Sequence, residues 1–176
     1  MNFKKTHLDG VIIVEPTIFQ DNRGFFMETF NEKYFQQNDI NEKFVQVNHS
    51  FSKKNVLRGL HFQNEPESQG KLVKCISGNI LDVAVDLRKD SPNYLKWISV
   101  KLSDENNLQI YIPNGFAHGF FVLSENAHVV YLCNEFYNTK YDNGIRWNDP
   151  LINIDWGQNI KPILSRKDAN LPFMEE

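Results

Sequence analysis

Residues 71–88 read Lys-Leu-Val-Lys-Cys-Ile-Ser-Gly-Asn-Ile-Leu-Asp-Val-Ala-Val-Asp-Leu-Arg, two apolar runs separated by Ser77-Gly78-Asn79. Short runs rich in β-branched residues and bounded by turn residues are typical of strands, and so short a turn predicts a hairpin. In the second run, apolar residues alternate with Asp82, Asp86 and Arg88. Because side chains alternate along a strand, the polar and apolar sets are expected on opposite faces.

Similar runs recur along the chain at spacings typical of an antiparallel sandwich or barrel. Helical periodicity is confined to one short stretch, 31–40, and no repeat or linker interrupts the pattern. We therefore expect an all-β fold with short peripheral helices, forming one domain over residues 1–176. The two runs quoted above are expected strands over Lys71–Ser77 and Ile80–Arg88. The remaining expected strands are Val11–Glu15, Gly24–Phe30, Phe44–Ser50, Val56–Gln63, Trp97–Leu102, Leu108–Ile112, Phe116–Leu123 and His128–Tyr137.

Composition excludes several classes of protein. The net charge of -3 and the pI near 6.0 give no basic surface for nucleic acid. The apolar runs are too short to span a membrane, and residues 1–14 lack the apolar core of a signal peptide. Cys75 and Cys133 lie in apolar runs and are expected to be reduced, buried residues. These features predict a cytoplasmic protein.

The segment from Val56 to Lys71 concentrates the polar groups that suggest chemistry. Arg58, His61 and Lys71 lie among apolar residues, where unpaired cations are costly unless a partner or a ligand compensates them. Simple alternation places Arg58 and His61 on opposite faces of one strand. A bulge or close backbone approach at Gly59 would bring them to a common face.

Two interpretations remain open for the polar strand faces, because they can face solvent or line a polar barrel interior that binds a ligand. Histidine suits proton transfer near neutral pH, which makes His61 the leading base and His118 the second. A metal site is the weaker interpretation, since Gln63 stands where metal-binding cupins carry a second histidine. We expect neither a metal nor another cofactor.

Motifs over nearly the whole chain resemble one family, the dTDP-4-dehydrorhamnose 3,5-epimerases. They include Asp21–Phe26, Asn48–Ser50, Val56–Gln63, Gln69–Val73, Asp82–Asp86, Ile112–Phe120, Trp147–Pro150 and Leu164–Asp168. The resemblance implies a metal-free, cupin-type double-sheet jelly roll that forms a homodimer. It also implies that the protein inverts C3 and C5 of its substrate, a dTDP-linked 4-keto-6-deoxyhexose. Epimerisation at only one carbon of a related 4-keto sugar nucleotide is the alternative.

The resemblance assigns a role to each matching residue. His61 matches the base, Asp168 its carboxylate partner, Lys71 the lysine near the sugar carbonyl and Tyr131 the acid. Tyr137 matches the aromatic residue that stacks on thymine. The other substrate contacts implied are Arg23, Glu28, Gln46, Asn48, Arg58, His118, Asp142 and Lys167. This chain departs from the family pattern at Val47, often Asp, and at Phe136, often Tyr.

Overall fold

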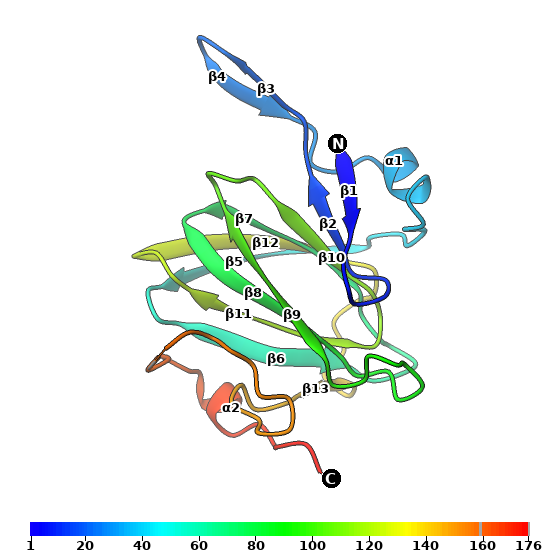
Figure 1. Ribbon diagram of the computed structural model, residues 1–176, viewed down its shortest axis with the longest axis vertical. Coiled ribbons are helices and arrows are strands. Elements are labelled where there is room, and N and C mark those ends of the chain that lie inside the picture. Colours follow the sequence, from blue (N-terminus) through cyan, green and yellow to red (C-terminus); the bar gives the residue numbers. More distant parts are fainter. Residues whose placement is uncertain (159, 176) are drawn as a thin grey trace.

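Two antiparallel sheets lie face to face in the computed structural model, which describes residues 1–158 and 160–175 (Figure 1). This confirms the expected all-β double sheet with short helices. The six-stranded sheet has the order β1 (Asn2–Lys5), β2 (Ile12–Glu15), β10 (Gln109–Ile112), β7 (Lys71–Ser77), β12 (Asn126–Cys133) and β5 (Gln46–Lys53). The five-stranded sheet has the order β13 (Asp142–Gly144), β6 (Leu57–Gln63), β11 (Phe116–Val122), β8 (Asn79–Asp86) and β9 (Trp97–Ser103).

Apolar side chains are buried in three layers. One cluster, which includes Val73, Ile80 and Phe120, fills the space between the sheets. The outer face of the six-stranded sheet is covered around α1 (Glu32–Gln36), whose first turn is capped by the Asn31 side chain. The C-terminal segment covers the outer face of the five-stranded sheet, where Trp156 is buried. Its short helix α2 (Arg166–Ala169) contacts β6.

The predicted hairpin at Ser77-Gly78-Asn79 is wrong. β7 ends at Ser77 and β8 begins at Asn79, but β7 pairs with β10 and β12 whereas β8 pairs with β9 and β11. Gly78 has a φ of +83°, and a Cβ there would lie 2.2 Å from the Asn126 carbonyl oxygen. This glycine therefore makes a corner between the two sheets, a sharp change of direction that its missing side chain permits.

An irregularity in β6 resolves the difficulty of Arg58 and His61. In the pairing of β6 with β11, His61 lies opposite His118 and Arg58 lies opposite Phe120. Three residue steps on β6 thus match two on β11, which is the extra residue of a β-bulge. Gly59, between them, has a φ of +120°, and a Cβ there would lie 2.7 Å from the Gly119 Cα. The expected bulge or close approach is confirmed.

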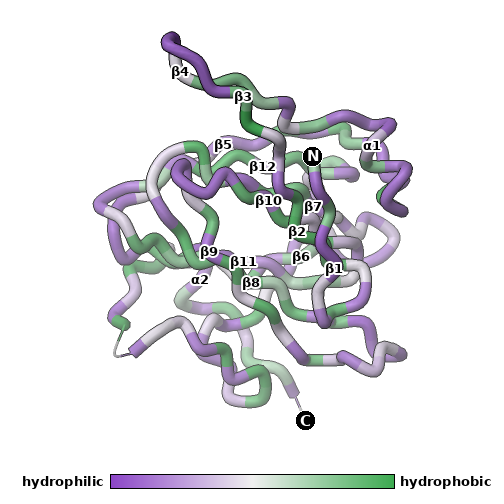
Figure 2. The backbone as a smooth tube through the Cα atoms, turned by 45° about the horizontal axis from the view of Figure 1, so that its top comes forward, coloured by the Kyte–Doolittle hydropathy of each residue, from purple (hydrophilic) through white to green (hydrophobic). Residues whose placement is uncertain are grey.

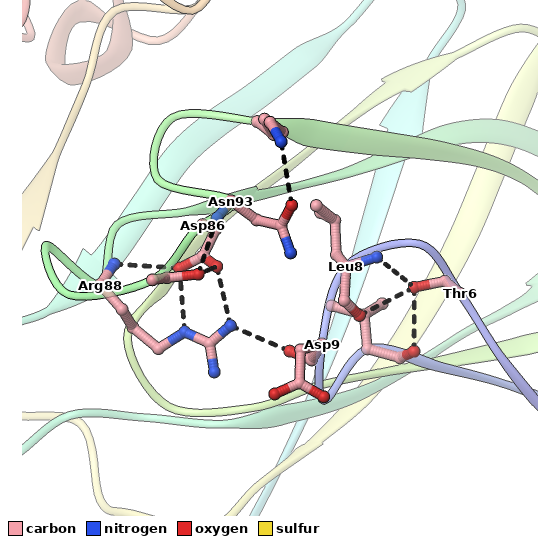
Figure 3. Close-up of polar contacts among 9 residues, drawn as sticks. Thr6, Leu8, Asp9, Asp86, Arg88 and Asn93 are labelled. Carbon is pink, nitrogen blue, oxygen red and sulfur yellow. Dashed lines mark hydrogen bonds and ion pairs between the residues drawn. The ribbon is translucent and has the colours of Figure 1, made fainter.

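A polar cluster fastens the N-terminal loop to the end of β8 (Figure 3). Arg88 donates from Nε and Nη2 to the two carboxylate oxygens of the fully buried Asp86, at 2.9 and 2.7 Å. Arg88 Nη2 also donates to the Asp9 carbonyl oxygen at 2.9 Å. Burial would raise the pKa of Asp86, but the hydrogen bonds from Arg88 and Ser91 and the Arg88 charge hold it below its usual range. This part of the polar face of β8 is thus structural.

The hairpin of β3 (Ile18–Asp21) and β4 (Gly24–Met27) stands away from both sheets (Figures 1 and 2). Its large apolar side chains are exposed, with Phe19 at 62% and Phe26 at 70%. Arg23 at its tip pairs with Asp21 of the same hairpin. The sequence indicated only β4, and β1, β3, β13 and α2 were not expected.

Candidate active site

A cavity of about 550 Å³ opens between the two sheets. Most of its lining residues are polar or charged, in contrast to the apolar residues that fill the rest of the space between the sheets. The inner faces of β5, β6, β7, β11 and β12 therefore bear the polar interior that was one of two open interpretations of the sequence. The cavity is lined by Gln46, Asn48, Ser50, Arg58, His61, Phe62, Gln63, Gln69, Lys71, His118, Phe120, Tyr131, Tyr137, Asp142 and Lys167.

His61 and Asp168 form a hydrogen-bonded pair, as expected from the C-terminal motif. His61 Nε2 lies 2.6 Å from Asp168 Oδ1, with the imidazole partly exposed to the cavity and the carboxylate buried. Burial would raise the pKa of Asp168, but hydrogen bonds from His61, Ser165 and the Gly59 backbone, with the His61 charge, hold it below its usual value. An ionised Asp168 accepts the Nε2 proton, which leaves Nδ1 of His61 able to accept another.

Lys71 and Tyr131 face His61 from the opposite wall, because they belong to the six-stranded sheet. Lys71 is buried, which lowers the pKa of its ammonium group, while the charges of Cys133, Asp142 and Asp82 act in the other direction. Burial also raises the pKa of Tyr131, so its hydroxyl keeps its proton at neutral pH. This wall thus presents an amine and a protonated phenol to the cavity.

A second histidine–aspartate pair lies beside the first. His118 Nε2 is 2.8 Å from Oδ2 of Asp82, and both residues are buried on the five-stranded sheet. The other oxygen of Asp82, Oδ1, is buried and has no hydrogen-bond partner among the described residues. Burial raises the pKa of Asp82, against the opposing effects of His118 and Lys71. His118 thus lines the cavity as expected, with an aspartate that the sequence placed only on a polar face.

The segment after β12 contributes Tyr137, and the first residue of β13 contributes Asp142, to the mouth of the cavity. The Tyr137 hydroxyl donates to Asp142 Oδ2 at 2.9 Å, and the same oxygen accepts from Lys167 Nζ at 2.5 Å. The Tyr137 backbone N–H donates to Gln46 Oε1, while Gln46 Nε2 donates to Asn48 Oδ1. These residues, which the resemblance implied as separate substrate contacts, therefore form one connected group.

Arg58 reaches the cavity with its guanidinium held by β5. Its Nε donates to Ser52 Oγ at 2.9 Å, and its Nη2 donates to the Phe51 carbonyl oxygen at 3.1 Å. These bonds orient the planar group, leaving its other N–H groups to meet an anion.

Two expected substrate contacts, Arg23 and Glu28, do not line this cavity. The side chain of Arg23 is 90% exposed at the hairpin tip, and Glu28 lines a separate cavity of about 320 Å³ with Phe19 and Phe26. Strand parity could not have shown this, because it gives the face of a residue and not the direction in which a hairpin projects. The departures Val47 and Phe136 are 66% and 61% exposed and are not among the lining residues.

Several lining residues were missed by the sequence reasoning, namely Ser50, Phe62, Gln69 and Phe120. Ser50 follows the parity of Gln46 and Asn48, and Phe120 follows that of His118, so alternation could have found both.

Gln63 lines the cavity but donates both amide N–H bonds to backbone carbonyl oxygens, those of Glu67 and Phe136. Within residues 1–158 and 160–175, no three metal-ligating side chains come together. No helix in this part of the chain is long and apolar enough to cross a membrane.

Comparison with known proteins agrees with the geometry of the cavity. The sequence model of the dTDP-4-dehydrorhamnose 3,5-epimerase family matches residues 5–176. The chain belongs to this family. It is 55% identical to the dTDP-4-dehydrorhamnose 3,5-epimerase of Methanothermobacter thermautotrophicus, over 99% of this chain and 95% of that protein. It is also 55% identical to that of Shigella flexneri, over 97% of this chain and 94% of the other.

Solved structures of epimerases superpose closely on this fold. The dTDP-6-deoxy-D-glucose-3,5-epimerase of Legionella pneumophila, in complex with dTDP-4-keto-L-rhamnose, gives a TM-score of 0.94 at 44% identity, over 98% of this chain and 92% of that one. A 3'-monoepimerase from Streptomyces bikiniensis, in complex with dTDP-quinovose, gives 0.89 at 34% identity, over 96% and 85% of the two chains. The two sheets are thus the cupin-type jelly roll of the epimerase family.

Proposed function

We propose that this protein is an isomerase that inverts C3 and C5 of a dTDP-linked 4-keto-6-deoxyhexose, converting dTDP-4-dehydro-6-deoxyglucose to dTDP-4-dehydro-L-rhamnose. The observation that carries the proposal is the His61–Asp168 pair, which faces Lys71 and Tyr131 across one cavity in a chain of this family. Such an arrangement suits removal and return of a proton at a carbon next to a ketone. The product is a precursor of dTDP-L-rhamnose.

Proton abstraction begins at His61. A hydrogen next to a ketone is only weakly acidic, so its removal requires a positioned base and stabilisation of the enolate oxygen. His61 Nδ1 takes the proton, and Asp168 holds the ring and stabilises the imidazolium that forms. The buried ammonium of Lys71 stabilises the enolate oxygen, an effect worth about 3 kcal/mol for a well-placed donor in a dry site.

Inversion requires that the proton return from the other face of the sugar. Tyr131 supplies it, because its strand lies in the sheet opposite that of His61 and its hydroxyl is protonated at neutral pH. C3 and C5 flank the same ketone, so one enolate oxygen position serves both half-reactions. A single base then suffices if the sugar ring reorients between them.

The remaining lining residues bind the nucleotide end and the sugar. Arg58 binds the diphosphate, since a guanidinium matches phosphate oxygens bidentately. Tyr137 stacks on thymine. Asp142 accepts the hydrogen bond of the Tyr137 hydroxyl and is itself bound by Lys167, and these residues surround the mouth of the cavity. Gln46, Asn48 and the His118 ring complete the contacts.

Deuterium incorporation tests this function directly. The wild-type protein is incubated with dTDP-4-keto-6-deoxyglucose in deuterated water, and label is located by NMR. We expect label at both C3 and C5, since each proton is exchanged with solvent through His61. Label at one carbon would instead support the alternative that a 3'-monoepimerase relative represents. Tyr131→Phe is expected to retain exchange and lose inversion.

The family also suggests a homodimer, and the projecting hairpin supports it. Its exposed phenylalanines would be buried against a second copy, since large exposed apolar patches commonly mark protein–protein interfaces. Arg23 and Glu28, which lie outside the cavity of their own chain, would then contact the substrate bound by the partner subunit. A homodimer in the cytoplasm is the assembly that we propose.

Mixing two inactive variants tests this assembly. If Arg23 acts in the partner's cavity, His61→Ala and Arg23→Ala subunits exchanged into one dimer form one intact site, and activity returns. If Arg23 acts in its own chain, every site in the mixture is damaged and no activity returns. Light scattering at micromolar concentration provides the mass, and a monomer would contradict the proposal.

A further inference from the structure

The segment that carries Tyr137 and Asp142 is held by the side-chain amides of three glutamines. Gln69 Nε2 donates to the Glu135 carbonyl oxygen at 2.8 Å. Gln46 Oε1 accepts from the Tyr137 N–H at 2.9 Å. Gln63 makes the largest number of bonds of the three to this segment, with Nε2 donating to the Phe136 carbonyl oxygen at 3.1 Å and Oε1 accepting from the Asn138 N–H at 2.7 Å.

Gln63 contacts this segment both around Tyr137 and at Asp142. Its side chain binds the residues on either side of Tyr137, and its backbone lies opposite Asp142 in the pairing of β6 with β13. A third side-chain bond, from Nε2 to the Glu67 carbonyl oxygen at 2.7 Å, ties the amide to the loop after β6. Gln63 is only 6% exposed, so these bonds are made away from competing water. Its amide group is used for the protein's own backbone.

We propose that Gln63 is a positioning residue that sets affinity for the nucleotide by holding residues 134–142 in place. It fixes the backbone around Tyr137 and so aims the ring, while the Tyr137 hydroxyl is fixed by Asp142. The inference rests on the proposed function, since it takes Tyr137 as the surface on which the base of the nucleotide stacks. Gln63 thus stands where metal-binding cupins carry a histidine ligand, but here its side chain positions the backbone.

The expected effect on nucleotide binding follows from the fraction of molecules in which residues 134–142 have the binding-competent conformation. When the binding-competent conformation of a loop is only a fraction of the total, the apparent dissociation constant rises in inverse proportion to that fraction. Removing the Gln63 amide leaves the Glu67 and Phe136 carbonyl groups and the Asn138 N–H without these partners, which favours other conformations of the segment. His61, Lys71 and Tyr131 lie on strands, so the chemical step should change much less than binding.

Gln63→Leu and the isosteric Gln63→Glu are the test variants. We expect the Kd for dTDP, measured by calorimetry, to rise about tenfold and KM for the sugar nucleotide to rise with it, while kcat stays within about threefold. Gln109→Leu is the matched control, because Gln109 is buried at 2% exposure and its Nε2 likewise donates to a loop carbonyl, that of Thr29, outside the cavity. The control should leave the Kd for dTDP unchanged.

A double-mutant cycle separates positioning from direct contact. If Gln63 acts through Tyr137, then Gln63→Leu should weaken dTDP binding little in a Tyr137→Ala background, so the two effects are not additive. Additive losses, or an unchanged Kd in a folded Gln63 variant, would overturn the proposal. If neither Gln63 variant folds, Gln69→Leu removes only the bond to Glu135 and should raise the Kd about threefold. An unchanged value there would also overturn it.

The outcome is distinguishable from a failure of the proposed function. Wild-type protein that binds dTDP but exchanges no deuterium into the 4-keto sugar would contradict the function and leave the dTDP measurements interpretable. Wild-type protein that exchanges normally, with Gln63 variants that bind dTDP as tightly as it does, would contradict only the role of Gln63.

Discussion

The two histidine–aspartate pairs of the cavity are neighbours with opposite surroundings. His61 and His118 lie directly opposite each other on β6 and β11. The side chain of His61 is 35% exposed, whereas that of His118 is 8% exposed. Asp168 is bonded by Ser165 and the Gly59 backbone as well as by His61, but Oδ1 of Asp82 has no partner among the described residues.

This difference separates the proposed base from a histidine that is held in the wall of the cavity. Burial acts to raise the pKa of both aspartates, and only at Asp168 do the hydrogen bonds outweigh it. The pKa of Asp168 therefore lies below its usual value, and its carboxylate pairs with a histidine that is partly exposed to the cavity. Asp82 is deep in the wall, where it holds His118 and contributes its charge to the surroundings of Lys71. The same two residue types thus serve different purposes because their solvation differs.

The largest expected effect is that of His61→Asn. Loss of the positioned base should slow deuterium exchange at both C3 and C5 by about 10³-fold, within the range that general bases contribute. NMR of the labelled product measures this, with dTDP binding as the control for folding. Exchange that persists at one carbon would remove the distinction between the pairs and make His118 a second base.

Asp168→Asn should have the next largest effect. The amide retains the size of the side chain but no longer stabilises the imidazolium, and it can hold the ring in the wrong tautomer. We expect kcat to fall about 10²-fold, with the Kd for dTDP within about twofold of wild type. Steady-state kinetics and calorimetry test this, and a fall in affinity without a fall in kcat would contradict the assigned role.

Asp82→Asn should reduce kcat only about tenfold, the equivalent of one charge-assisted hydrogen bond. Its distinguishing effect lies in the pH profile. Burial lowers the pKa of Lys71, and the Asp82 charge opposes this, so neutralising Asp82 lets the Lys71 pKa fall further. The alkaline limb of kcat should therefore move to lower pH, and an unmoved limb would show that Asp82 does not act on Lys71.

The smallest expected effect is on stability. Because the folded-state pKa of Asp168 is below its usual value, the carboxylate stabilises the fold above its unfolded pKa of about 3.9. This contribution is lost as the pH falls through the folded-state pKa. Urea unfolding should thus show a gap between wild type and Asp168→Asn near pH 6 that narrows below about pH 4. A constant gap would mean that the Asp168 charge adds nothing to stability.

Alternation of apolar and polar residues, together with turn residues, predicted most strands of the two sheets from the sequence. Ten strands were expected close to their observed positions, with β7 placed at Lys71–Ser77 without error, because strand side chains alternate with a fixed period of two. Which strands pair was not predictable at Gly78. A glycine between two strands permits either a hairpin or a corner, and only packing of the two sheets decides between them.

Periodicity along the chain was enough to assign the polar and apolar faces of the strands, and the family motifs were enough to identify the candidate catalytic residues. Tertiary structure decided that Asp168 meets His61 across 107 positions of sequence and that a bulge brings Arg58 to the same cavity. It also decided that Arg23 lies outside it. Periodicity reflects only neighbouring residues, whereas burial, pKa and pairing depend on groups that only the folded chain brings together.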